Sequence, residues 1–211
     1  MPIITLDAVS KAYQGRPLYR NVNLEVNEGD FVSFSGPNGS GKSVLFRLMC
    51  RFLSPDTGTV TIDPRFMSRG RSFPESFGIL IDRPGYLPSR TGIDNLRELA
   101  AIRGVIGDDE IRATLESLGL DPALKQRVRQ YSLGMKQKLA LAQAFMESPK
   151  VLILDEPFNA LDADAVANVK AMLRALNEQG VTIVFTSHNA QDVEELAKKR
   201  YPIENETLVA A

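Results

Sequence analysis

The sequence feature that most constrains the fold is a glycine-rich run of the form G-x-x-x-x-G-K-S, made of Gly36, Pro37, Asn38, Gly39, Ser40, Gly41, Lys42 and Ser43. Its glycines let backbone N–H groups turn inward around a phosphate, and a helix that starts near Lys42 adds the positive end of its dipole. In such a loop the lysine reaches the β and γ phosphates and the Ser43 hydroxyl binds Mg²⁺. Because the spacing is not G-x-G-x-x-G, a dinucleotide-binding fold is disfavoured.

The segments around this loop predict an α/β core. The strand Phe31–Ser35 leads into the loop, and a helix over residues 44–53 follows it. Two continuous apolar runs, at 151–154 and 181–185, are typical of parallel strands covered on both faces. Short strands are expected in the first 30 residues, among them residues 21–26, whose polar and apolar side chains alternate. Further strands are expected at residues 60–62, continuing the same sheet, and at 77–81, and a helix at 163–179. Strands and helices that alternate around a phosphate loop indicate an α/β fold.

Residues 92–148 lack strand signals and predict a helical insertion. Helices are expected from about residue 96 to 103, from 109 to 118 and from 137 to 147. We therefore expect a core subdomain formed by about residues 1–82 and 150–211, and a helical subdomain formed by about residues 83–149, within a single domain.

Composition narrows the classes of partner. The chain has 211 residues, with 25 Lys and Arg against 26 Asp and Glu, so no basic excess indicates a nucleic-acid partner. One cysteine, Cys50, excludes an intramolecular disulfide and favours a reducing compartment. No apolar run approaches the ~20 residues that span a bilayer, and the N-terminus lacks the charged region of a signal peptide. We expect a cytoplasmic protein that reaches a membrane only through a partner.

An acidic pair follows the apolar strand at 151–154, namely Asp155 and Glu156. Ligands of α/β sheets bind at the carboxyl ends of the strands. One acid there can hold Mg²⁺ and the other can polarise an attacking water, because phosphoryl transfer depends on positioning and charge neutralisation. The alternative is a solvated strand end without chemistry, but the phosphate loop favours Asp155 as a metal ligand and Glu156 as a catalytic base. His188, the only histidine, follows the next strand and is expected to contact the γ-phosphate and the water, with a purely structural role as the alternative.

The order of these motifs resembles the ATP-binding cassette (ABC) family of ATPases along essentially the whole chain. Between the phosphate loop and the acids stands the segment Tyr131-Ser132-Leu133-Gly134-Met135-Lys136-Gln137, which P-loop proteins in general lack. The resemblance implies a P-loop NTPase fold of ABC type, with a mixed core sheet, N-terminal antiparallel strands and a helical subdomain. It also implies ATP hydrolysis that requires Mg²⁺.

In that family the segment at 131–137 is the signature, usually L-S-G-G-Q, which contacts the γ-phosphate held by a second cassette. Ser132 and Gly134 match it, whereas Tyr131, Leu133 and Met135 depart from it. From the residues alone, a helix N-cap is the better explanation of Ser132. The resemblance further implies that Tyr13 stacks on adenine, with Tyr19 as the competing candidate. Asp162 would contact the second cassette, and an N-cap is an equally good explanation.

Two positions depart from the family in the nucleotide site. Asp82 stands where the family usually has a glutamine that binds Mg²⁺ and faces the permease, and Val44 replaces a Thr or Ser that contacts the α-phosphate. The acid at position 82 and the residues of the signature resemble those of the bacterial cassettes that export bacitracin, lantibiotics and other drugs.

The function implied is the ATP-hydrolysing subunit of a bacterial ABC transporter, in the exporter direction. Two cassettes, identical or paralogous, would clamp ATP and drive a separate transmembrane permease at the inner face of the membrane. The alternative is a non-transport ABC ATPase that acts as a regulatory or assembly factor.

Overall fold

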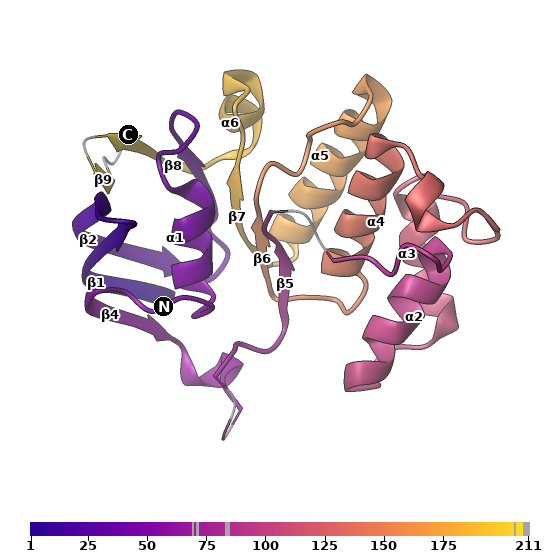
Figure 1. The fold of residues 1–211 in the computed structure, drawn as a ribbon, viewed down its shortest axis with the longest axis horizontal. Helices are drawn as coiled ribbons and strands as arrows, with labels where there is room; N and C mark the ends of the chain where they lie inside the picture. Colours follow the sequence, from indigo (N-terminus) through magenta and orange to yellow (C-terminus); the bar gives the residue numbers. More distant parts are fainter. Residues whose placement is uncertain (69, 71, 83–84, 205, 209–211) are drawn as a thin grey trace.

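The computed structural model describes residues 1–68, 70, 72–82, 85–204 and 206–208. Its central element is a six-stranded sheet of order β5-β6-β7-β3-β8-β9, in which all neighbours are parallel except the last pair. The strands are β3 (Phe31–Ser35), β5 (Phe77–Leu80), β6 (Val151–Leu154), β7 (Thr182–Thr186), β8 (Lys199–Glu204) and β9 (Thr207–Leu208). Figure 1 shows this sheet between an N-terminal sheet on one side and most of the helices on the other. The predicted α/β class is confirmed.

The N-terminal strands form a separate antiparallel sheet. It has the order β2-β1-β4, with β1 (Pro2–Tyr13), β2 (Arg16–Asn27) and β4 (Thr57–Ile62). The expectation of short strands is wrong, because β1 and β2 have 12 residues each. They are joined by a two-residue turn, Gln14 and Gly15, with φ of 50° and 78°, the backbone that matches the twist of a hairpin. The expectation that residues 60–62 continue the central sheet is also wrong, since β4 pairs with β1.

Two hydrophobic clusters fill the two faces of the central sheet. Helix α1 (Lys42–Met49) lies between the two sheets, and the first cluster joins it to the N-terminal strands and to Val151 and Ile153. Leu152 and Leu154 point to the opposite face and pack with the remaining helices. Because side chains alternate along a strand, the apolar run of β6 serves both clusters, which explains why it shows no polar position.

The segment between β5 and β6 is helical within the residues that the structure describes. It contains α2 (Gly92–Arg103), α3 (Asp108–Ser117), the short 3₁₀ turn η2 (Val128–Gln130) and α4 (Leu133–Phe145). Helix α4 begins four residues before the predicted start, because the Ser132 hydroxyl caps it by accepting a hydrogen bond from the Met135 N–H at 3.1 Å. The proposed boundary at residue 83 lies outside the described residues, and the division into two subdomains stays a prediction.

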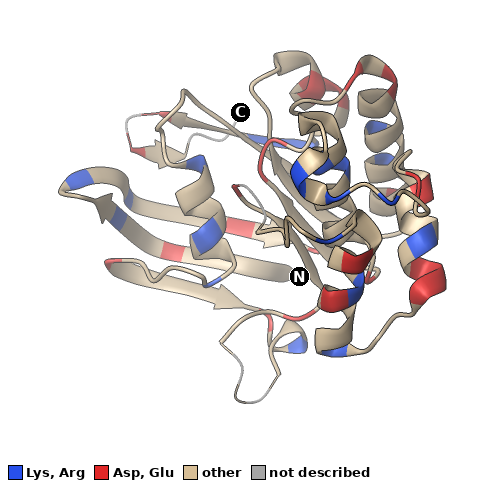
Figure 2. Cartoon of the chain, turned by 45° about the vertical axis from the view of Figure 1, so that its right-hand side comes forward, with Lys and Arg blue, Asp and Glu red and all other residues tan. Residues whose placement is uncertain are grey.

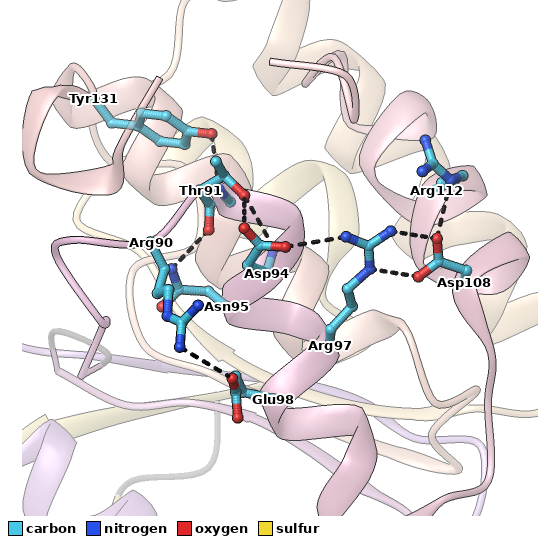
Figure 3. A network of polar contacts seen from close by, with 10 residues as sticks. Arg90, Thr91, Asp94, Asn95, Arg97, Glu98, Asp108, Arg112 and Tyr131 are labelled. Carbon is cyan, nitrogen blue, oxygen red and sulfur yellow. Dashed lines mark hydrogen bonds and ion pairs between the residues drawn. The ribbon is translucent and has the colours of Figure 1, made fainter. Parts of the chain in front are cut away.

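A polar network fastens α2 to α3 (Figure 3). The Arg97 guanidinium contacts Asp94 at 3.0 Å and Asp108 through its Nε at 2.6 Å. The Thr91 hydroxyl caps α2, and the Gly92 N–H donates to the buried Tyr131 hydroxyl at 3.2 Å. Tyr131, one of the departures from the family signature, therefore anchors the start of α2.

After β6 the chain forms α5 (Ala163–Glu178), β7, α6 (Ala190–Leu196) and the two terminal strands. The sequence predicted α5 and β7 but neither α6 nor β8 and β9. Within the described residues, no helix combines the length and apolar character needed to cross a bilayer. In the view of Figure 2, basic and acidic residues are interspersed along the helices.

Candidate nucleotide-binding site

The glycine-rich loop lies between the end of β3 and the start of α1. Gly39 and Gly41 have φ of 83° and 96°, in the left-handed region that glycine adopts without strain. The Lys42 ammonium donates to the carbonyl oxygens of Gly36 and Pro37, at 2.8 and 3.2 Å, and so folds back over the loop. Among the residues that the structure describes, the buried Ser40 hydroxyl has no hydrogen-bond partner. A buried hydroxyl without a partner is costly, which is consistent with a loop shaped to receive a polar ligand.

The carboxyl ends of β6 and β7 bring the Asp155 carboxylate close to this loop. Asp155, directly after β6, accepts hydrogen bonds from Ser43 of α1 and, at 2.7 Å, from the Thr186 hydroxyl at the end of β7. The Thr186 hydroxyl in turn accepts from the Glu156 N–H at 2.8 Å. Sequence reasoning missed Thr186, although its place at the end of a buried strand was a usable signal.

The Ser43 and Asp155 oxygens suit Mg²⁺, which prefers oxygen ligands and is usually bound by one or two carboxylates together with substrate phosphates and water. Groups of three or more His, Cys, Asp or Glu that could hold a metal are absent from the described residues. The donor set therefore fits an ion that the phosphates help to bind, rather than one held by the protein alone.

Glu156 and His188 meet at the same edge. The Glu156 carboxylate lies 2.8 Å from His188 Nδ1 and accepts from the His188 N–H at 3.3 Å. Glu156 has φ of 51°, a left-handed backbone that is uncommon for a residue with a side chain. The side chains are 21% and 70% exposed, so both are reachable from solvent. An acid and an imidazole in contact beside a phosphate loop can orient a water and accept its proton.

A cavity of about 550 Å³ connects the loop with the hairpin of β1 and β2. Its lining includes Tyr13, Lys42, Ser43, Val44 and Asp155. Tyr13 is 58% exposed at the rim. Tyr19, the competing candidate, is 1% exposed beneath Gly41, and its hydroxyl has no hydrogen-bond partner within the described part of the chain. Burial, reinforced by the charge of Asp155, raises the pKa of Tyr19. Of the two tyrosines, only Tyr13 has a ring that an adenine could reach from solvent.

A second cavity of about 640 Å³ lies next to the first and shares Asp155 and Glu156 with it. Asp82 lines this second cavity and forms an ion pair with Arg47 of α1, while Arg47 also lines the first cavity. Asp82 has φ of 56°, so the chain turns sharply after β5. The carboxylate of Asp82 therefore has a cationic partner in the protein and an open cavity beside it.

The predicted signature residues lie apart from the loop of their own chain. Ser132 is exposed, and neither it nor Gly134 lines the cavity that holds Lys42. A Cβ added at Gly134 would lie 2.8 Å from the Ala160 carbonyl oxygen, so the start of α4 packs closely on the segment after the acids. The Gln137 amide donates to the carbonyl oxygens of Glu156 and Pro157, at 3.2 and 2.9 Å, and ties the two segments together. Asp162 caps α5 by accepting from the Ala165 N–H at 2.8 Å.

Comparison with known proteins gives a consistent family. The family model described as "ABC transporter" matches residues 19–159. The chain is 32% identical to the uncharacterized ABC transporter ATP-binding protein YdbJ of Bacillus subtilis over 94% of this chain and 65% of the relative. It is 32% identical to the bacitracin transport ATP-binding protein BcrA of Enterococcus faecalis, over 92% of this chain and 64% of BcrA. It is also 32% identical to the lantibiotic transport ATP-binding protein SrtF of Streptococcus pyogenes, over 92% of this chain and 84% of SrtF.

Among solved structures, the dimeric post-hydrolysis state of the ATP-binding cassette MJ0796 bound to ADP and Pi is similar in fold. The TM-score is 0.86 at 24% identity, with 97% of this chain and 96% of that chain covered. The chain thus has the cassette fold along nearly its whole length, whereas it spans only about two thirds of YdbJ and BcrA.

Proposed function

The chain belongs to the ABC transporter family, and on that premise we propose that it binds and hydrolyses ATP to power a separate membrane permease, in the exporter direction. The single observation that carries the ATPase proposal is the contact of Glu156 with His188 at 2.8 Å, beside the loop of Lys42. A cassette kept only for binding would not need an acid and an imidazole held together at the sheet edge.

The chain's own residues supply the chemistry of hydrolysis. Lys42 exchanges the carbonyl oxygens of its loop for the β and γ phosphates, and backbone N–H groups of the loop bind the same oxygens. Mg²⁺, bound by Ser43 and Asp155, would neutralise charge on the phosphates. Glu156 orients the attacking water and accepts its proton, and His188 holds the Glu156 carboxylate and would contact the γ-phosphate.

The partners follow from the incomplete site. Ser132 and Gly134 lie outside the cavity of their own Lys42, so we propose that they act on the nucleotide of a second cassette, identical or paralogous. The permease is proposed as the membrane anchor of the pair, at the inner face of the membrane. Exporter direction is supported by the relatives named for bacitracin and lantibiotic transport. No observation favours the alternative of a regulatory or assembly factor.

The decisive experiment uses Glu156→Gln, which keeps the size of the side chain and removes the charge that orients water. We expect hydrolysis to fall by about 10²–10⁴-fold, the contribution typical of a general base. ATP should still bind, and because it is then held between two cassettes, a dimer should persist on gel filtration with Mg-ATP.

Lys42→Ala is the matched control, because it should lose ATP binding and therefore show no nucleotide-dependent dimer. Undiminished hydrolysis in Glu156→Gln would refute the role of the base. A monomer with ATP demonstrably bound would instead refute the composite site between two cassettes.

A further inference from the structure

The position of His188 needs an explanation beyond its own contacts. Its side chain is 70% exposed, and among the described residues the one hydrogen bond of its ring is to Glu156. An exposed side chain with a single partner keeps rotamer freedom unless the backbone beneath it is fixed. The residues that fix this backbone therefore decide whether the ring reaches Glu156.

A buried polar chain lies directly behind the histidine. The Ser187 hydroxyl donates to the Asp192 carboxylate at 2.9 Å and accepts from the Asn189 N–H at 3.1 Å, so it ties the residue before His188 to two residues after it. The other oxygen of Asp192 lies 2.8 Å from the Lys170 ammonium of α5. Ser187 and Asp192 are each 5% exposed, and Lys170 is 8% exposed.

Lys170 also links this chain to the segment of Glu156. Its ammonium lies 5.9 Å from the centre of the Phe158 ring, two residues after Glu156, and contacts Glu195 at 2.8 Å. Burial alone would lower the pKa of Lys170, but its hydrogen bonds to Asp192 and Glu195 outweigh that effect and raise the pKa. The Lys170 ammonium thus links α5 to α6 and to Phe158, which follows the proposed base Glu156.

We propose that Lys170, Asp192 and Ser187 form a positioning relay that sets His188 against Glu156. The proposal rests on the proposed ATP hydrolysis, because that is the reaction in which His188 would act. A buried ion pair is weak evidence for stability on its own, since desolvation offsets its Coulomb energy. The ion pair has a specific geometric effect here. It fixes the Asp192 carboxylate, which accepts a hydrogen bond from Ser187, the residue directly before His188.

The first test is spectroscopic and does not depend on activity. His188 is the only histidine of the chain, so in tag-free protein its ring gives one set of ¹H–¹³C and ¹H–¹⁵N signals that need no assignment. Asp192→Asn should move these ring signals toward those of Glu156→Gln, in which the partner charge of the ring is gone. Glu195→Gln is the matched control, since Glu195 contacts Lys170 at the same 2.8 Å but has no hydrogen bond to Ser187 among the described contacts. Ring signals of Asp192→Asn that coincide with the parent's would overturn the relay.

The second test uses hydrolysis and epistasis. Asp192→Asn should lower kcat by about tenfold with KM for ATP unchanged, the lower end of the loss seen when a ligating histidine loses its outer hydrogen-bond partner. Ser187→Ala should do the same while leaving the ion pair of Lys170 and Asp192 intact, which guards against a variant that merely fails to fold. Neither change should lower the rate further in a His188→Ala protein, because both act through that ring.

The same tenfold loss in the His188→Ala background would show a general structural effect and overturn the proposal. A parent protein without ATP hydrolysis would refute the proposed function instead, and the ring signals would still decide whether the relay exists.

Discussion

Replacing Asp82 by Asn tests the predicted metal-binding role of the acid that stands where the resemblance leads us to expect glutamine. The carboxylate of Asp82 pairs with Arg47 and lines a cavity that it shares with Asp155 and Glu156. If the carboxylate turns to Mg²⁺ when nucleotide binds, it brings a full negative charge to a cation that prefers oxygen ligands. Without the metal, the same charge repels the γ-phosphate. We therefore expect ATP binding to depend steeply on Mg²⁺, and Asp82→Asn to lessen that dependence and strengthen metal-free binding.

The structure sets a bound on the alternative, in which Asp82 only holds the turn after β5 and faces solvent. The side chains of Arg47 and Asp82 are 44% and 45% exposed. Exposed ion pairs contribute about 0.2–1 kcal/mol, and about 1.4 kcal/mol corresponds to a tenfold change in an equilibrium constant. Loss of this pair can thus change ATP affinity by about fivefold at most, with and without Mg²⁺ alike. If Asp82 binds the metal, Asp82→Asn should lower the ratio of the Kd without Mg²⁺ to the Kd with Mg²⁺ by more than about fivefold.

The assay is a calorimetric titration of ATP with Mg²⁺ and with EDTA, in a Glu156→Gln background so that ATP is not consumed. Arg47→Met is the matched control, because it removes the same ion pair and keeps the carboxylate, so the Kd ratio should stay as high as in the parent. An unchanged Kd ratio in Asp82→Asn would refute the metal role and leave Asp82 as a turn residue.

Three further outcomes are expected. Tyr13→Ala should weaken ATP binding by about 1–3 kcal/mol, the value of a stacked base, whereas Tyr13→Phe should bind ATP as the parent does in a fluorescence titration. An affinity of Tyr13→Ala equal to that of the parent would exclude stacking. Gly78→Ala should lower the melting temperature strongly, because the added Cβ would lie 2.0 Å from a backbone carbonyl oxygen of α4, whereas Gly85→Ala meets nothing within 4 Å and should not. Hydrogen bonds from Arg97 lower the pKa of Asp108 from 3.8 to about 2, so the contact of α2 with α3 should contribute stability above pH ~4 and lose it as the pH falls toward ~2. In Arg97→Met the pKa of the Asp108 carboxyl should rise toward its ordinary value by NMR, with the smaller effect of Arg112 remaining, and a carboxyl that still titrates near 2 would contradict that cause.

The sequence predicted the parts of the fold that depend on local pattern. The strand Phe31–Ser35 and the apolar run Val151–Leu154 have the predicted bounds, and α5 ends one residue before the prediction. Helix α1 ends at Met49 rather than at residue 53, since Arg51 has a left-handed φ of 58° that apolar spacing does not reveal. Periodicity identifies which face of an element is buried. It does not locate the end of a helix, because many sequences permit the backbone angles at which a helix stops.

Strand β8 escaped prediction because its pattern is not that of a buried strand. It contains Lys199 and Arg200, and a proline at position 202. It pairs with β3 and is only half-buried over most of its length, with β9 as the edge beyond it. Polar residues and proline are tolerated there because β9 pairs only with Ile203 and Glu204, so Pro202 and the residues before it pair with β3 alone and are only partly covered, whereas sequence reasoning relies on continuous apolar runs. The pairing of β1 with β4 was missed for a related reason, since pairing across about 50 residues leaves no local trace.

The order of the strands explains why the candidate site forms at all, and it is the step that the sequence could not supply. Strand β7 lies between β3 and β6, with Phe34 opposite Thr186 and Leu154 opposite Phe185. Two strand spacings of ~4.8 Å therefore separate the end of β3 from the end of β6, about 10 Å in all. Adjacent strands would bring Asp155 against the backbone of the phosphate loop and leave no space for a triphosphate. The Thr186 hydroxyl, at the end of the intervening strand β7, ties that strand to the residues that follow β6, since it donates to Asp155 and accepts from the Glu156 N–H. Replacement of this hydroxyl by a methyl group would keep the strand order and leave Asp155 with its hydrogen bond from Ser43, so the space between the strands and the aim of the acids are set by different residues.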